Sequence, residues 1–333
     1  MLRRKRVALY VTIGVIAGLA LTVYLPWYAV GPGPARAVQP LIRFGDRTRY
    51  ESQGSFVMTS VRYTRLTGFD MLLAWLDPDR AVVARSVLYP DGKDVQVERE
   101  RSISQMDSSK LDASAVVLRA LEGYPKNHGD GVLIESVVSG CAADGELFPG
   151  DRILSIGGEP VDSYRDASRA IEAAPSGSSL TFDLSVDGDP ETVDLVREPC
   201  GDSRDPLVGV RMINSFPFQV SISSGEIGGP SAGLMWSLGL YDLLTPGDLT
   251  GGRLVAGTGE IGLDGTVGPI GGIGDKIVAA RGVGADIFLV PKDNMAEART
   301  VDAGDMRLVP VGSFDDALAA LGVTLPSDTP TAA

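Results

Sequence analysis

The sequence predicts a multidomain α/β (α+β) protein that begins with a transmembrane helix, and three observations support this fold class. The chain has 333 residues, of which 44% are apolar and 22% charged, so it can fill more than one hydrophobic core. An uncharged apolar stretch lies near the N-terminus, and patterns typical of strands and helices alternate along most of the remaining chain. Such a mixture of elements is typical of globular α/β and α+β domains.

The composition argues against several classes of function. With a formal net charge of −13, the chain is a poor candidate for binding nucleic acid, because phosphate contacts need clustered lysine and arginine. The single histidine, His128, lies in a polar segment typical of a linker, so neither a Ser-His-Asp triad nor a histidine-rich metal site is expected. Two cysteines cannot form a four-thiolate zinc site, and the sequence contains no P-loop motif. We therefore expect no metal, no cofactor and no internal ATPase.

Residues 7–28 are predicted to form a transmembrane helix. Residues 7–25 contain no charged side chain, and about 20 apolar residues are needed to span about 30 Å of hydrocarbon. The basic segment 1–6 predicts a cytoplasmic N-terminus, with the rest of the chain on the extracytoplasmic side of the cell membrane. A cleaved signal peptide is the alternative, because small residues flank Arg36 as they would at a cleavage site.

Residues 35–126 form an upstream α/β segment that the sequence leaves without a role. Residues 54–66 alternate and are rich in β-branched types, which predicts a strand. A short amphipathic helix is expected from Asp112, as its N-cap, to a stop at Gly123. We expect the segment to pack on the C-terminal unit or to cover it, and we place a boundary in the polar stretch 124–130.

Residues 129–198 are predicted to form a small β-rich domain, with strands at 132–138, 152–156 and 180–186 and a helix at 164–174. Within it, the stretch ADGELFPGDRILSIGGEPVDSYRDASRAI resembles bacterial PDZ domains. The resemblance rests on the small residues, the L-x-PGD turn, the I-x-x-I-x-G-x-x-V pattern and the helix that follows. It implies a PDZ fold for this part of the chain.

The PDZ resemblance also implies a peptide-binding groove. PDZ domains bind an extended peptide by adding it as a strand beside a groove between a strand and a helix. Transferred to this sequence, the groove would be lined by Gly131, Val132, Leu133 and Ile134. The family's Gly-Leu-Gly-Phe loop is absent from the sequence, and a PDZ domain that only packs against its neighbour is the alternative.

Cys141 and Cys200 flank one compact segment of the chain. In an oxidising compartment the two thiols could form a disulfide. Two unrelated thiols are the alternative, and the sequence does not decide between them.

The motif GGPSAG at 228–233 contains the first candidate for chemistry. Its glycines permit a tight turn, and its proline fixes φ at the start of a helix. On this turn, Ser231 could attack a carbonyl group, and the backbone N–H groups of Ser231 and Ala232 could stabilise the oxyanion. As the alternative, serine is a favoured cap residue and the motif could simply begin a helix.

Lys276 follows the glycine-rich stretch GGIG and is the second candidate. An ordinary lysine has a pKa of about 10.4 and is no base at neutral pH, but burial among apolar groups lowers that pKa. A neutral amine could accept the serine proton and later return it to the leaving group. The alternative is a surface lysine, or an ion pair with Asp275.

The order GGPSAG, TGEIGLDGTVGPIGGIGDK and AARGVGADIFLVPKDN resembles the proteolytic domain of Lon-type proteases. The resemblance predicts that residues 205–322 form such a domain. The sequence of residues 325–333, LPSDTPTAA, is typical of a disordered tail. The resemblance also implies a Ser-Lys dyad in which Ser231 is the nucleophile and Lys276 the base, while Thr258 supports the dyad by hydrogen bonding. Where the family often has Asp before GPSAG, this sequence has Gly229.

Together, the order of segments resembles the membrane-anchored PDZ-containing Lon-like proteases of Gram-positive bacteria. It implies an ATP-independent serine endopeptidase, tethered to the outer face of a membrane, that cleaves unfolded or flexible proteins with PDZ-assisted recognition. Expected partners are protein or peptide substrates, the membrane and further copies in a homo-oligomeric ring such as a hexamer, but no nucleic acid. The alternatives are a catalytically inert membrane-anchored PDZ scaffold that binds peptides, and an enzyme activated only by a partner ATPase or by ring assembly.

Overall fold

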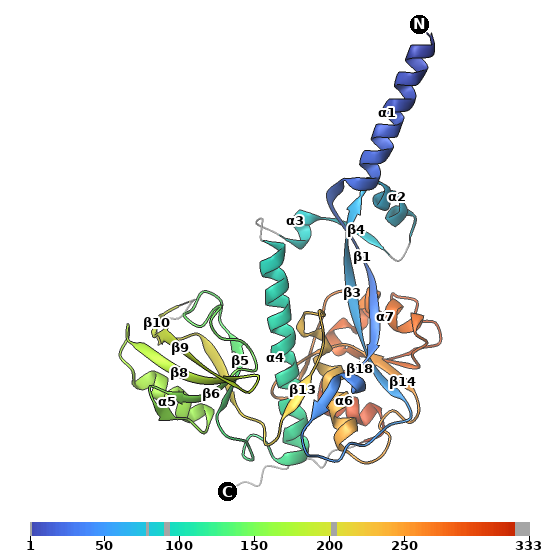
Figure 1. Ribbon diagram of the computed structural model, residues 1–333. Helices are drawn as coiled ribbons and strands as arrows, with labels where there is room; N and C mark the ends of the chain where they lie inside the picture. The colour runs from blue at the N-terminus through green and yellow to red at the C-terminus, as the bar shows by residue number, and fades with distance from the viewer. Residues whose placement is uncertain (1, 78–79, 90–93, 201–204, 324–333) are drawn as a thin grey trace.

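The computed structural model describes residues 2–77, 80–89, 94–200 and 205–323. Figure 1 shows a larger and a smaller body on either side of a long helix, α4 (Val95–Glu122), while helix α1 (Leu2–Thr22) projects from the larger body. The blue and orange segments intertwine in the larger body, so the N-terminal and C-terminal parts of the chain build it together.

The larger body is built on a six-stranded mixed sheet. The strand order is β18 (Arg307–Val311), β17 (Ile287–Pro291), β14 (Leu254–Gly257), β3 (Ser55–Thr67), β1 (Tyr24–Ala37) and β4 (Ala81–Ala84). The first four strands run parallel, and β1 pairs antiparallel with both β3 and β4. The upstream segment therefore completes the sheet of the C-terminal unit.

Helices cover both faces of this sheet, and neighbouring side chains of β3 reveal the two cores. Val57 packs in the apolar cluster of α7 (Ile273–Gly282), whereas Met58 packs in that of α6 (Gly233–Leu244). Successive side chains of a strand point to opposite faces of its sheet. Helices α6 and α7 therefore lie on opposite faces, and β3 runs between them.

Shorter elements complete the larger body. They are η1 (Gln39–Leu41), β2 (Ile42–Phe44), α2 (Gly68–Leu76), α3 (Arg85–Leu88), β13 (Val220–Ile222), η3 (Pro230–Ala232), β15 (Glu260–Ile261), β16 (Val267–Gly268), η4 (Lys292–Asn294), α8 (Met295–Ala298) and α9 (Phe314–Ala320). Strand β13 pairs with β2, and β15 pairs with β16. The predicted tail at 325–333 lies outside the described residues.

Helix α4 is longer than the helix expected from Asp112 onward. It spans 28 residues, with Asp94 as the N-cap and Gly123, at a φ of 71°, as the C-cap. Asp112 lies in the middle of the helix and caps nothing. The first half of α4 is too polar to show a clear helical periodicity, and it packs partly against backbone of the turn before α6.

The smaller body contains a second sheet of six strands. Its order is β12 (Val210–Asn214), β5 (Val132–Val137), β6 (Arg152–Ile156), β8 (Ser179–Val186) and β9 (Asp189–Val196), with β7 (Glu159–Pro160) paired to β6. Helix α5 (Tyr164–Ala173) covers it and is capped by Ser163, and β10 (Glu198–Pro199) pairs with β11 (Pro206–Leu207) nearby. Strand β12, which the sequence analysis places with the C-terminal unit, is the edge strand of this sheet.

The N-terminal segment corrects the prediction of a transmembrane helix over residues 7–28. Helix α1 ends at Thr22, and the chain continues from Tyr24 as strand β1. At about 1.5 Å per residue, the apolar residues 7–22 cover about 24 Å, less than the roughly 30 Å of a hydrocarbon layer. Across the described ranges, no helix is long and apolar enough to cross a membrane. The predicted transmembrane helix, and the single-pass localisation that depended on it, are therefore wrong.

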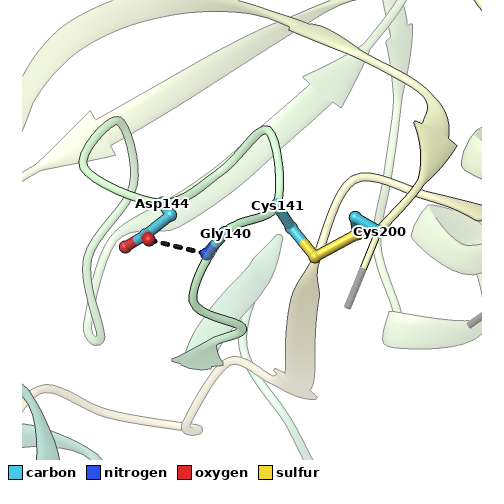
Figure 2. Close-up of a disulfide and its surroundings, with 4 residues drawn as sticks. All are labelled: Gly140, Cys141, Asp144 and Cys200. Carbon is cyan, nitrogen blue, oxygen red and sulfur yellow. Dashed lines mark hydrogen bonds between the residues drawn. A yellow bond between two sulfur atoms is a disulfide. The ribbon is translucent and has the colours of Figure 1, made fainter. Parts of the chain in front are cut away.

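Cys141 and Cys200 form a disulfide that ties two loops of the smaller body together. The sulfur atoms are 2.10 Å apart and the cysteines are separated by 59 residues in sequence. Figure 2 shows that the loop carrying Cys141 is also held by a hydrogen bond of 2.8 Å from the Gly140 N–H to the Asp144 carboxylate. The disulfide thus closes a loop that contains most of the smaller body.

Removing this crosslink is expected to destabilise the smaller body. For a loop of this length, the entropy model predicts that the double change Cys141→Ala and Cys200→Ala lowers the free energy of unfolding by about 4 kcal/mol. Native-state hydrogen exchange followed by mass spectrometry measures this loss of stability. Backbone amides of β5 and β8 should lose protection, while those of β14 and β17 should keep theirs. Equal protection of β5 and β8 in the double variant and the parent would contradict the prediction.

Candidate active site

Ser231 lies on a turn that the sequence forces into a narrow range of conformations. Gly229 has a φ of 86°, which residues with a Cβ atom rarely adopt. Pro230 is the first residue of η3, where its missing N–H costs no hydrogen bond. Helix α6 begins at Gly233, so Ser231 sits in the first turn of a continuous helical segment. The N–H groups of Ser231 and Ala232 precede the first carbonyl-bonded N–H of this segment, that of Gly233, and can serve as donors to a ligand.

Lys276 approaches the same place from the opposite face of the sheet. It belongs to the first half of α7, which begins after Gly272 in the left-handed conformation, at a φ of 68°. The side chain is 3% exposed, although lysine is almost never buried without a partner. Its helix neighbours Ile273 and Ile277 are buried in the apolar cluster of this face.

The structure brings Ser231, Lys276 and Thr258 into one hydrogen-bonded group. Lys276 Nζ lies 2.6 Å from Ser231 Oγ and 3.0 Å from Thr258 Oγ1. Thr258 Oγ1 in turn donates to the Ser231 carbonyl oxygen at 2.8 Å. The backbone N–H of Gly259 donates to that same oxygen, also at 2.8 Å. All three side chains singled out in the sequence therefore meet at the end of β14.

These bonds fix the direction in which the amine can accept a proton. Because the Thr258 hydroxyl proton is directed to the Ser231 carbonyl, its oxygen faces Lys276 as an acceptor. An amine N–H of Lys276 then points to Thr258. In the neutral amine, this arrangement leaves the nitrogen lone pair free to face the Ser231 hydroxyl.

Burial lowers the pKa of Lys276 to about 8, because an ammonium group loses its hydration inside the protein. The charge of Glu260 raises the pKa and so offsets part of this effect. Burial raises the pKa of Glu260 itself, and the nearby Lys276 charge lowers it. Glu260 was not among the site residues expected from the sequence, although it lies two residues after Thr258 in TGEIG.

Two further contacts hold the site and were missed in the sequence. Ser109 Oγ of α4 donates to the Pro230 carbonyl at 2.9 Å, and the Gly229 N–H donates to the Ser102 carbonyl at 2.7 Å. The sequence carries no signal for either contact, because α4 is distant in sequence and its first half is polar. Helix α4 thus braces the turn that carries the nucleophile candidate.

Asn294 holds the loop that leads into α7. Its side-chain oxygen accepts from the Ile270 N–H at 2.8 Å, and its amide group donates to the Ile270 carbonyl at 2.9 Å. Asn294 is buried, so both bonds are shielded from water. The loop before Lys276 is therefore fixed at one residue by a pair of hydrogen bonds, and no local sequence pattern identifies this role of Asn294.

The predicted groove residues of the smaller body lie inside its sheet. Gly131, Val132, Leu133 and Ile134 are buried, and strand β5 pairs with β12 on one side and with β6 on the other. Their backbone therefore offers no free edge to a peptide strand. The edge strands of this sheet are β12 and β9. Strand β12 lies beside the N-terminus of α5, where the Tyr164 N–H donates to the Asn214 side chain at 2.8 Å.

A serine hydroxyl beside a buried amine can perform acyl transfer, with the amine as general base and general acid. The backbone N–H groups of Ser231 and Ala232 supply candidate donors for an oxyanion. Within the part of the chain that the structure describes, no group of three or more His, Cys, Asp and Glu side chains could hold a metal ion.

Comparison with known proteins finds two family matches. The profile of the Lon protease (S16) C-terminal proteolytic domain matches residues 218–322, and that of the PDZ domain matches residues 133–184. Ser231, Thr258 and Lys276 all lie inside the first match. The Lon match supports a serine peptidase.

Relatives include the Lon protease of Methanosphaera stadtmanae, 29% identical over 210 residues that cover 61% of this chain and 21% of that protein. The Lon protease of Rickettsia typhi is 31% identical over 134 residues, which cover 38% of this chain and 17% of that protein. The alignments thus span about a fifth of these relatives. Among solved structures, the PDZ domain of an SdrC-like protein from Listeria monocytogenes aligns with a TM-score of 0.24 and 23% identity, covering 25% of this chain and 88% of that chain.

The two family matches fall on the two bodies of the structure. The PDZ match lies within the smaller body, from β5 to β8, and the Lon match extends from the residues before β13 to the end of α9. The chain therefore contains a Lon protease C-terminal proteolytic domain together with a PDZ domain.

Proposed function

We propose that this protein is a serine endopeptidase that uses a Ser-Lys dyad, with Ser231 as the nucleophile and Lys276 as the general base and acid. The observation that carries the proposal is the 2.6 Å contact between Ser231 Oγ and the amine of Lys276, a residue that is only 3% exposed. Thr258 orients the amine through the hydrogen bonds described above. No step of this chemistry consumes a nucleotide, so the hydrolysis itself is independent of ATP.

Acylation begins with the neutral amine. Ser231 Oγ attacks the peptide carbonyl while its proton passes to Lys276 Nζ, and the carbonyl oxygen becomes an oxyanion. The N–H groups of Ser231 and Ala232 stabilise that charge. The protonated amine then gives its proton to the leaving nitrogen, the C–N bond breaks, and an ester to Ser231 remains.

Deacylation repeats the same steps with water. The neutral Lys276 amine accepts a proton from a water molecule as the water oxygen attacks the ester carbonyl. When the tetrahedral intermediate collapses, the proton returns to Ser231 Oγ and the carboxylic acid product leaves. The dyad is then in its starting state.

The substrates proposed are unfolded or flexible polypeptides, because the structure offers no element that would pull a folded chain apart among its described residues. The free edge of β12 beside α5 supports a role for the PDZ domain in recognising such segments, since PDZ domains add a peptide as a strand. Assembly into a ring stays a prediction from the Lon resemblance. An inert peptide-binding scaffold is the competing hypothesis. The burial of Lys276 argues against it, because burying an ammonium group costs free energy that an inert protein would avoid by placing the lysine at the surface.

Replacing either member of the dyad should abolish peptide hydrolysis. Ser231→Ala removes the nucleophile and Lys276→Met removes the base, so each variant should lose at least about 10³-fold in kcat. The rate of cleavage of a fluorogenic unstructured peptide measures this loss in kcat. Ser237→Ala and Lys292→Met are matched controls, because Ser237 bonds only to its own helix and Lys292 forms an exposed ion pair with Asp316. Activity in the two dyad variants equal to that of their controls would reject the dyad and favour the scaffold.

Activity should rise with pH through the titration of Lys276. Because its pKa is lowered to about 8, the neutral base is the minor form at pH 7 and the major form at pH 9. We expect kcat/KM to increase about tenfold between pH 7 and pH 9. A pH–rate profile measures this, with the melting temperature recorded at each pH as a control. A flat profile in a protein that stays folded would contradict lysine as the base.

Glu260→Gln should move the pH profile toward lower pH. The Glu260 carboxylate favours the protonated form of Lys276, so neutralising it lowers the pKa of the amine further. More of the enzyme then carries a neutral base at pH 7. The inflection of the kcat/KM profile gives the shift, and Glu297→Gln, at an exposed position of α8, is the control. A shift toward higher pH would contradict the electrostatic role of Glu260.

A further inference from the structure

We propose that Ser109 is a positioning residue that aims the backbone N–H of Ser231 at the oxyanion. This inference rests on the proposed Ser-Lys hydrolysis and assigns a task to helix α4, which lies outside the matched proteolytic region. In the described part of the chain, the Ser109 hydroxyl donates to the Pro230 carbonyl and takes no part in the hydrogen bonds of the dyad side chains. It acts on the peptide unit that precedes the nucleophile.

The Ser109 hydroxyl is buried against the turn that carries Ser231. Its side chain is 3% exposed, and its Oγ donates to the Pro230 carbonyl at 2.9 Å. The Gly233 N–H donates to the same carbonyl. A Cβ atom on Gly233 would lie 2.6 Å from Ser109 Oγ, so the absence of a side chain there leaves the hydroxyl its place.

The planar peptide bond transmits this contact to Ser231. In a trans peptide unit, the C=O of one residue and the N–H of the next point in opposite directions. Holding the Pro230 carbonyl toward Ser109 therefore turns the Ser231 N–H away from α4. That N–H is one of the two candidate oxyanion donors.

The peptide unit after Ser231 is held in the same way from the other side. The Thr258 hydroxyl and the Gly259 N–H both donate to the Ser231 carbonyl, which fixes the direction of the Ala232 N–H. Ser109 thus fixes the direction of the Ser231 N–H, as Thr258 fixes that of the Ala232 N–H. In one helical turn the two N–H groups point toward the same end, where a single oxygen can meet both.

A turn rich in glycine needs such restraint, because glycine peptide units can reorient at little cost. Gly229 has a positive φ of 86°, and its N–H donates to the Ser102 carbonyl of α4 at 2.7 Å. Helix α4 therefore holds the turn at Gly229 and at Pro230. Without the Ser109 hydroxyl, only the Gly233 N–H would still hold the Pro230 carbonyl.

The test compares Ser109→Ala with Ser114→Ala. Ser114 is also 3% exposed on α4, but its hydroxyl donates at 2.8 Å to the Lys110 carbonyl of its own helix. Since removing an oxyanion donor costs about 10²–10³ in kcat, misaiming one should cost about tenfold. We expect Ser109→Ala to lower kcat about tenfold with KM changed less than about twofold, and Ser109→Cys, a weaker donor of similar shape, to lie between. Ser114→Ala should match the parent.

A second measurement separates positioning from loss of stability. A peptide boronate forms a tetrahedral adduct with Ser231 and needs the oxyanion donors, whereas the same peptide with a reduced, uncleavable bond does not. Ser109→Ala should weaken the boronate about tenfold and leave affinity for the uncleavable peptide unchanged. The inflection of the pH profile should stay in place, because Ser109 does not contact Lys276.

Each outcome decides a different question. If Ser109→Ala retains the kcat and boronate affinity of Ser114→Ala, the inference is overturned while the proposed dyad stands. If Ser109→Ala loses affinity for the boronate and for the uncleavable peptide equally, Ser109 has only a structural role and the inference is again overturned. If the unaltered protein neither cleaves peptides nor binds the boronate, the proposed function fails, and the role of Ser109 fails with it.

Discussion

Placing a lysine amine inside the protein, next to a serine hydroxyl, is the constraint on which the active-site region depends. An ammonium group loses much of its hydration on burial, so the fold must surround it with apolar packing and a few well-placed oxygens. Lys276 receives both: apolar neighbours on α7, and the oxygens of Ser231 and Thr258 at the end of β14. Side chains from helices on opposite faces of the sheet can meet there because β14 ends at Gly257.

The upstream segment and the C-terminal segment form one core, although the PDZ domain separates them in sequence. Met106 and Val117 of α4 share an apolar cluster with Trp236 of α6. The chain leaves this core after α4 and returns to it after β12, and the Tyr124 hydroxyl donates to the Asn214 carbonyl where exit and return meet. The PDZ domain is therefore an insertion whose two connections are tied together, and it can be accommodated without interrupting the sheet of the larger body.

Local sequence patterns singled out Ser231 and Lys276 as candidates, and the Lon resemblance joined them with Thr258. GGPSAG places glycine at Gly229, where φ is positive, and Lys276 is a lysine in an apolar helix, so both carry signals within a few residues. Ser109 and Asn294 carry no such signal, because each bonds to backbone atoms that are distant in sequence. From the sequence alone, these two residues cannot be told apart from other small polar residues. The same limit explains α4, whose polar first half hides its helical period, and β12, whose pairing with β5 is decided by tertiary contacts. At the N-terminus, hydropathy alone did not reveal that the helix gives way to strand β1 after Thr22.

The candidate site depends on elements from both parts of the larger body and not only on the sequence motifs that contain Ser231, Thr258 and Lys276. Residues 218–322 contain the nucleophile candidate, the base candidate and Thr258, yet the strand between α6 and α7 is β3, and the helix that braces the Ser231 turn is α4. Both precede the PDZ domain in the chain. Helix α4 also packs against the PDZ domain through Leu118, which shares an apolar cluster with Leu133 and Ile213, so the same helix contacts that domain and the turn that carries Ser231.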